Sequence, residues 1–407
     1  MAITRKNLGG LEHLDTRLYL LLAFLGVAIL RAYLLLSVYH DPSVYHTSTR
    51  LDVVLHSHFA FGMLEGEFFH YDVNGVDIEY SPVLPVLVGL IAIPLHFFGV
   101  PELHATFLSV SILMGLTSLG LLLQLSQYNL SRLAILFIVI LNPIDTIGVL
   151  PWGGFSMTLS AGLTAFAIYF HRRHQEEEGN RFLWLCIASM MLSASIHRTG
   201  LLVQASVLMV LIVGQLANRE RRKVRRREWM VIAGCLALLV PLFLGRVLPL
   251  IQATPVLAGN GLLEKFGFVF LVLPIRFTLV FAVLCAIGFM IRLRQLSSQT
   301  TPLSLRYPST SRIRLDVIYL CVGLMFYVMP LKDIELSTRF FAFFHGVIYY
   351  FFCYSFKMFN RPSIRTRWYN TALVGILVFC GLCISTRNIL HHSQSLMIFF
   401  RDTLGLA

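Results

Sequence analysis

Long apolar runs separated by short polar segments recur along the whole chain of 407 residues. A membrane-spanning helix needs about 20 consecutive apolar residues, and most of these runs approach that length. The runs predict helices at approximately 18–38, 83–98, 105–125, 132–149, 155–170, 182–197, 200–217, 229–249, 268–291, 315–331, 340–356 and 369–386. We therefore expect an all-α fold, a polytopic integral membrane protein with about 10–12 transmembrane helices.

The composition favours the same class. Hydrophobic residues make up 57% of the chain and charged residues 13%, whereas a soluble domain carries about 25% charged residues. All seven cysteines lie inside apolar runs, which argues against a disulfide framework or a zinc site. No polar stretch is long enough for a separate soluble domain, so we expect residues 1–407 to form a single membrane domain with a retained first helix.

Basic residues explain the net charge of +12 and predict an orientation. They gather in short segments between apolar runs, which is the positive-inside pattern of cytoplasmic loops and not that of a nucleic-acid partner. These segments are 171–181, 219–228, 292–314 and 357–367. The connections between them, including 142–154 and 197–199, are then expected on the other side. The basic N-terminus and the basic segment 171–181 should lie on the same side, which requires an even number of crossings between them, but the predicted helices give an odd number. The proline-rich run 83–98 is the candidate for a segment that does not cross.

The polar segment 40–81, which follows the first predicted helix, differs from the other loops in being acidic. It contains five of the fourteen histidines, and Arg50 is its only basic residue apart from them. Its carboxylates are Asp41, Asp52, Glu65, Glu67, Asp72, Asp77 and Glu79. Residues 51–69 mix apolar side chains with His and Glu, which predicts an amphipathic helix in the membrane interface on the extracytoplasmic side.

The order of residues around this loop is similar to that of a known group. Arg31 lies in the first apolar run, Asp52 follows it, and the loop ends in Tyr80-Ser81-Pro82. Further along come Asn142-Pro143 and Arg339 in the stretch STRFFAFF. This pattern resembles the GT-C superfamily of membrane glycosyltransferases, which use polyprenyl-phosphate-linked sugars. The chain departs from the family in having Ser81 before Pro82 and in lacking a close Asp-x-Asp pair near Asp52.

The resemblance implies a hexosyl transfer, with mannosyl as one form of it, to a lipid-linked or cell-surface glycan acceptor. A base must take the proton of the acceptor hydroxyl, and a cation must neutralise the leaving phosphate. Asp52 is the first candidate for the base and Asp41 the second. The phosphate-binding candidates are Arg339, Arg198 and Arg50, and the substrate-loop candidates are His56, His58, Glu79, Tyr80 and His197. We name no metal ligand and no certain cofactor, and a divalent cation is left open.

These residues also have purely structural interpretations. Asp52 could cap the helix that follows it, and Arg339 could be an anchor at the membrane interface. His56 and His58 could form a metal-binding pair, although a spacing of two suits a strand or loop better than the predicted helix. We expect the site on the periplasmic face of a bacterial inner membrane, in contact with membrane lipid.

Two other functions compete with the transferase. The segment SASIHRTGLL at 193–202 resembles polymerases of O-antigen and exopolysaccharide, which act on undecaprenyl-diphosphate-linked repeat units. A transporter of lipid-linked glycans is the second alternative. It is less favoured because no internal repeat is visible and the charges predicted inside spans, chiefly Arg31, Arg246 and Arg276, have no acidic partner there.

Overall fold

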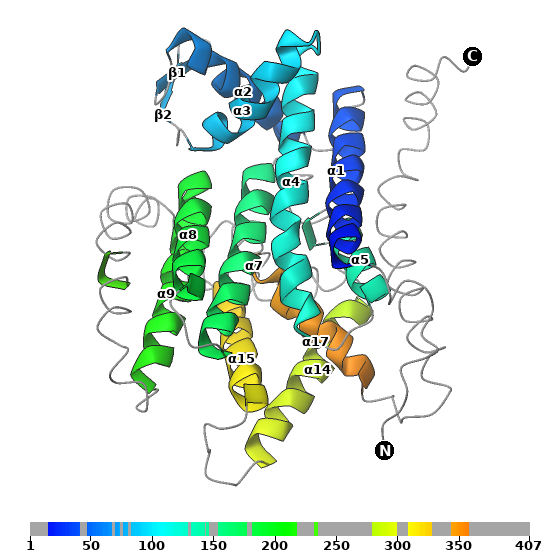
Figure 1. The fold of residues 1–407 in the computed structure, drawn as a ribbon, viewed down its shortest axis with the longest axis vertical. Coiled ribbons are helices and arrows are strands. Elements are labelled where there is room, and N and C mark those ends of the chain that lie inside the picture. The colour runs from blue at the N-terminus through cyan, green and yellow to red at the C-terminus, as the bar shows by residue number, and fades with distance from the viewer. Residues whose placement is uncertain are drawn as a thin grey trace, which may run out of the picture.

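The described residues are helical apart from one short β-hairpin, as a computed structural model shows (Figure 1). The structure describes residues 15–40, 47–66, 70–73, 76–79, 83–128, 132–142, 144–145, 154–176, 181–217, 232–234, 279–298, 308–327 and 343–357. The expected all-α class is therefore confirmed for the described residues, with the hairpin as an addition that the apolar pattern did not predict.

Four helices form the centre of a bundle. They are α1 (Thr16–His40), α4 (Glu102–Ser126), α5 (Arg132–Leu141) and α7 (Phe155–Glu176). Helix α4 packs against both α1 and α7. At the crossing with α7, Gly120 and Gly162 bring the two backbones together, because a Cβ on Gly162 would lie 2.7 Å from the carbonyl oxygen of Thr117. Small residues at such crossings allow helices to approach closely.

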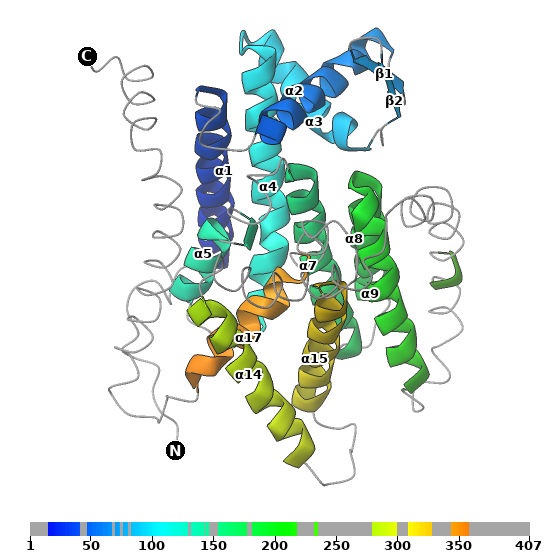
Figure 2. The ribbon, with the colours of Figure 1, turned by 180° about the vertical axis from the view of Figure 1, so that it is seen from behind.

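The remaining helices surround this centre (Figures 1 and 2). On one side α8 (Arg181–Ile196) packs along α7, and α9 (Arg198–Ala217) packs against α8. The C-terminal helices α14 (Leu279–Ser298), α15 (Pro308–Tyr327) and α17 (His345–Lys357) gather near the end of α4. Helix α17 packs most extensively on α14.

One end of the bundle is covered by a small unit, which we call the cap. It comprises α2 (Thr47–Gly62), η1 (Met63–Glu65), β1 (His70–Val73), β2 (Val76–Glu79) and α3 (Val83–Phe97). The two strands are antiparallel, with His70 opposite Glu79. Helix α3 packs on α2 and on α4, and Figure 1 shows the cap beside the N-terminal part of α4.

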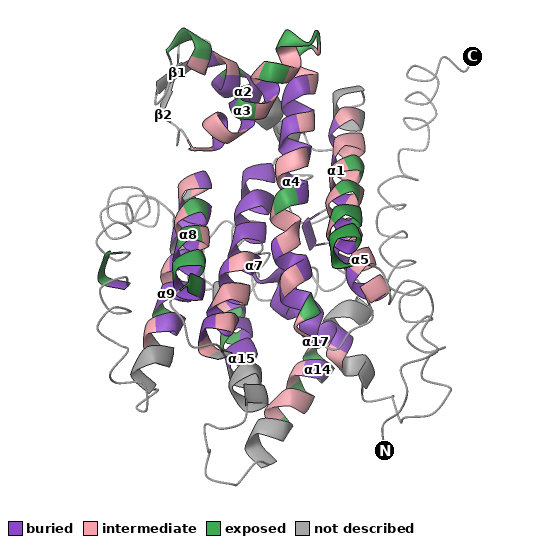
Figure 3. Ribbon diagram, viewed as in Figure 1, coloured by how far each residue is buried: buried purple, intermediate pink, exposed green. Residues whose placement is uncertain are grey.

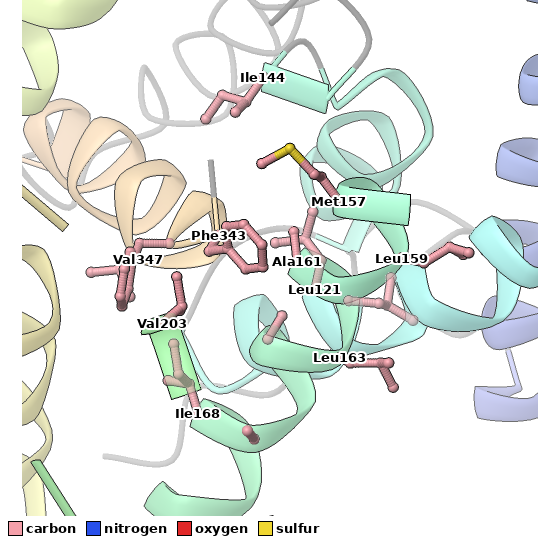
Figure 4. Packing of buried hydrophobic residues seen from close by; sticks show 14 of the residues in the cluster. Leu121, Ile144, Met157, Leu159, Ala161, Leu163, Ile168, Val203, Phe343 and Val347 are labelled. Atoms are coloured by element: carbon pink, nitrogen blue, oxygen red, sulfur yellow. The ribbon is translucent and has the colours of Figure 1, made fainter. Parts of the chain in front are cut away.

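The core lies where α7 meets α4, α9 and α17. Figure 4 shows Phe343, which lies just before α17, close to Ala161 of α7 and Leu121 of α4. Helix α7 is buried along most of its length, as the colouring of Figure 3 makes clear. By contrast, α1 exposes an apolar stripe at helical spacing: Leu18, Leu21, Leu25 and Ile29, of which Ile29 is 66% exposed.

Most predicted helices correspond to observed ones, but one prediction needs correction. The helix expected over 132–149 ends at Leu141, because Asn142 has a φ of 29° and Pro143 follows it. In the connection 142–154, the described residues Asn142, Ile144 and Asp145 are buried inside the bundle. The expected extracytoplasmic side of this connection stays a prediction. The predicted helix at 369–386 lies outside the described residues.

Among the described residues, two helices are long and apolar enough to cross a membrane, Thr16–Leu36 and Glu102–Ser126. Five shorter apolar helices accompany them, including Val83–Phe97 and Arg132–Leu141. Core helices of soluble proteins can also have this length and apolar composition, so these two helices by themselves are weak evidence for a membrane protein.

Candidate functional site

Helix α2 of the cap carries four of the sequence-predicted site residues: Arg50, Asp52, His56 and His58. The helix begins at Thr47, so Asp52 lies at its sixth position and does not cap it. The capping interpretation of Asp52 is therefore wrong. The side chains of Arg50 and Asp52 lie outside the described part of the structure, and their catalytic and phosphate-binding roles stay predictions.

His56 and His58 lie on different faces of α2. His58 is exposed, whereas His56 is buried with its ring 4.4 Å from the ring of Phe155 at the start of α7. His56 therefore joins the cap to the bundle, and its predicted substrate-loop role stays a prediction. The hydroxyl of Thr106 on α4 donates to that of Ser57 at 3.0 Å and forms a second link between cap and bundle.

Burial lowers the pKa of His56 from its ordinary value of 6.5 to about 3. The unfolded chain therefore takes up a proton near pH 6.5, while the folded chain resists it until about pH 3, and stability falls as the pH drops through this window. We expect a loss of about 2 kcal/mol at pH 5. In His56→Phe, the denaturation midpoint should vary less between pH 7 and 5 than in wild type. His58→Phe is the exposed control, and an equal slope in all three proteins would contradict the assignment.

The turn between α8 and α9 lies at the same end of the bundle as the cap. His197 is half-buried there, and Arg198 is the first residue of α9, with its side chain not described. Two contacts show how far along α7 this turn lies. The hydroxyl of Ser160, five residues after Phe155 on α7, donates to the carbonyl of Ser193 at 2.8 Å. Gly200 packs against both serines. The cap and His197-Arg198 therefore share one end.

The other predicted site residues receive little structural information. Glu79 ends strand β2 and pairs with His70 in the hairpin. Asp41, Tyr80 and Arg339 lie outside the described residues. Their predicted roles are unchanged.

A polar cavity lies inside the bundle, beneath the cap. Helices α1, α4 and α7 line it together with the break after α5 and the start of α17. Its charged and titratable lining residues are Arg31, Asp145 and His345, each no more than 3% exposed. The cavity has room for about one water molecule and is not fully enclosed. Thr158 of the lining lies one helical turn from Phe155, where the cap is attached.

The break after α5 shapes this cavity. The side-chain amide of Asn142 donates to Oδ2 of Asp145. The Tyr349 hydroxyl donates to Oδ1 of Asn142 at 2.9 Å and accepts from the backbone N–H of Ile144 at 3.1 Å. Nδ1 of His345 lies 3.5 Å from Oδ1 of Asp145. Irregular backbone at membrane depth is tolerated where it lines a cavity, and it often marks a functional site.

Sequence reasoning identified Arg31 and Asn142 but missed Asp145 and His345. It also expected Arg31 to lack an acidic partner, whereas Asp145 lines the same cavity. The available signal was the Asn142-Pro143 pair, because a proline after an apolar run ends a helix and exposes backbone polar groups. No pattern linked that pair to His345, which lies about 200 residues further along the chain.

The opposite end of the bundle is basic. Apart from Arg31, every described arginine side chain lies there: Arg17, Arg132, Arg172, Arg173, Arg181, Arg292 and Arg294. Contacts tie this end together. Tyr19 of α1 donates to the carbonyl of Arg132 at 3.1 Å, and Arg172 of α7 donates to Gln127 after α4 at 3.2 Å. Arg172 also forms a buried ion pair with Asp316 of α15.

Among the described residues, no group of three or more His, Cys, Asp or Glu side chains is arranged to hold a metal ion. Comparison of the sequence with known protein families and with curated individual proteins finds no match.

Proposed function

We propose that the chain is an integral membrane glycosyltransferase that moves a hexosyl group from a polyprenyl-phosphate-linked sugar to a glycan or glycolipid acceptor. The observation that carries the proposal is a cavity lined by Arg31, Asp145 and His345 inside an apolar bundle. Ionisable residues in such surroundings are expensive to bury and are usually retained for function. A buried cation beside a proton acceptor can stabilise and deprotonate a hydroxyl group that attacks a phosphate-linked sugar.

The distribution of charge supports a membrane orientation. The described arginine side chains other than Arg31 gather at one end of the bundle, while the described residues of the acidic segment 40–81 lie at the other. Such an asymmetry follows the positive-inside rule and favours a cytoplasmic basic end. The exposed apolar stripe of α1 is suited to contact with lipid.

The position of α3 accounts for the odd count of crossings in the first third of the chain. Helix α1 runs from the basic end to the cap, and α3 stays with α2 at the cap. Helix α4 then returns to the basic end, since Thr106 contacts the cap while Gln127 contacts Arg172. If α3 does not cross, the four remaining predicted spans 18–38, 105–125, 132–149 and 155–170 bring residue 171 to the same side as the N-terminus, as the basic loops require.

Transfer can be measured in membrane vesicles from cells with and without the protein. The probe donor is a polyprenyl-phosphate mannose labelled with carbon-14, and the acceptors are the lipids of the same membranes. We expect label to enter glycolipid only when the protein is present, with the products separated on a gel. No difference between the two membranes would overturn the transferase proposal. The polymerase and transporter alternatives remain distinguishable, because a polymerase would extend a ladder of repeat units and a transporter would leave all products unchanged.

A further inference from the structure

The cavity beneath the cap offers a specific group for the proton transfer of the proposed reaction. Nδ1 of His345 faces Oδ1 of Asp145 at 3.5 Å. Nε2 of the same ring is buried and has no hydrogen-bond partner among the described residues. Nδ1 of His345 and Oδ1 of Asp145 also make no hydrogen bond among the described residues, so their contact is one of ion-pair range only. A carboxylate that draws closer to Nδ1 would hold the proton there and leave the lone pair on Nε2, as in a general base.

The buried position makes this arrangement unusual for a structural histidine. His345 is 1% exposed and Asp145 is 3% exposed, and buried polar atoms normally have partners. Asp145 is held in place by Asn142, which is itself held by Tyr349. Asn142 therefore orients the carboxylate, and neither ring nitrogen of His345 makes a hydrogen bond in the described part of the structure.

The size and charge of the cavity limit that ligand. Its room for about one water molecule admits a hydroxyl group but not a whole phosphate. The guanidinium of Arg31 lines the same cavity, which disfavours a metal cation and favours an oxygen that acquires negative charge. A hydroxyl of the acceptor meets both requirements.

We propose that His345, oriented by Asp145, is the proton acceptor of the sugar transfer, in place of the sequence-predicted Asp52. This inference rests on the proposed function. The acceptor hydroxyl gives its proton to Nε2 of His345, and its oxygen forms the new bond to the anomeric carbon. The bond from that carbon to the phosphate oxygen breaks, and the electron pair leaves with the polyprenyl phosphate. Arg31 stabilises the negative charge on the hydroxyl oxygen, and the imidazolium later releases its proton to water.

The test uses the vesicle assay with the labelled mannose donor. In His345→Ala we expect transfer to fall by about 100-fold or more, as removal of a general base does. Added imidazole should restore part of the rate, because the variant leaves a space of imidazole size beside Asp145. Asp52→Asn should retain at least tenfold more activity than His345→Ala. Melting temperatures of the purified variants in detergent establish that each one is folded.

The outcomes separate the two proposals. If wild-type vesicles transfer no label, the proposed function and this inference both fall. If wild type is active and folded His345→Ala stays within a few-fold of it, only the inference is overturned. If both His345→Ala and Asp52→Asn are inactive, restoration of His345→Ala by imidazole supports the inference, and a lack of restoration overturns it.

Discussion

Asp316→Ala should lower the free energy of unfolding by about 3–5 kcal/mol, because it leaves the buried charge of Arg172 without its partner. Both side chains of the pair are 1% exposed. The Tyr128 hydroxyl also donates to Asp316 at 3.0 Å, and the guanidinium of Arg172 lies 4.7 Å from the centre of the Tyr128 ring. The variant therefore disrupts a network that joins α7, α15 and the end of α4. The measurement is reversible unfolding in mixed micelles of increasing SDS content.

A double variant distinguishes the effect of losing the ion pair from the effect of losing side-chain volume. Arg172→Met combined with Asp316→Leu removes both charges and keeps apolar side chains in their places. Replacing both members of a buried pair is often neutral or stabilising, so this double variant should recover most of the stability that Asp316→Ala loses. Equal stability of Asp316→Ala and wild type would contradict the predicted contribution of the pair.

Gly162→Ala should destabilise the bundle by about 1–3 kcal/mol, the usual cost of overpacking. Replacing glycine by alanine within a helix normally stabilises it by about 0.5–1 kcal/mol, so the expected sign is the reverse of the intrinsic one. The reason is the crossing with α4, where the new Cβ would lie 2.7 Å from the backbone oxygen of Thr117. Backbone cannot move aside as a flexible side chain can, so α4 and α7 must separate.

Gly234→Ala is the matched control for this substitution. Gly234 also lies in a helical segment, but a Cβ built on it has no atom of the described residues within 4 Å. Its stability should equal or slightly exceed that of wild type in the same SDS titration. If Gly162→Ala and Gly234→Ala behave alike, the close approach of α4 and α7 does not limit stability.

The hydrophobic pattern determined much of the helical architecture. Helices α1, α4, α7, α8 and α9 lie close to their predicted ranges, because each is a long apolar run bounded by polar residues. The pattern also predicted a helix after the first apolar run, and α2 confirms it. It did not predict the β1–β2 hairpin, since four-residue strands of mixed polarity lack a clear period.

The site was less predictable, because hydrophobicity reports burial of a run and not the partner of a single side chain. The sequence showed that Arg31 and the Asn142-Pro143 pair occur in or beside apolar runs. Burying such polar groups costs free energy, so their presence there points to a functional position. Only the tertiary structure decided that Asp145 and His345 join Arg31 around one cavity. The Asn142-Pro143 pair marks where α5 ends, but local composition does not determine which residue about 200 positions further along packs against that end.

The same distinction applies to the cap. The sequence alone showed that an acidic segment with several histidines follows the first predicted helix. The tertiary structure decided that His56 faces inward against Phe155 while His58 faces outward. Two residues apart on a helix differ by about 200° in direction, so packing against α7 buries one and exposes the other. Local sequence supplied the two histidines, and the position of the neighbouring helix determined the environment of each.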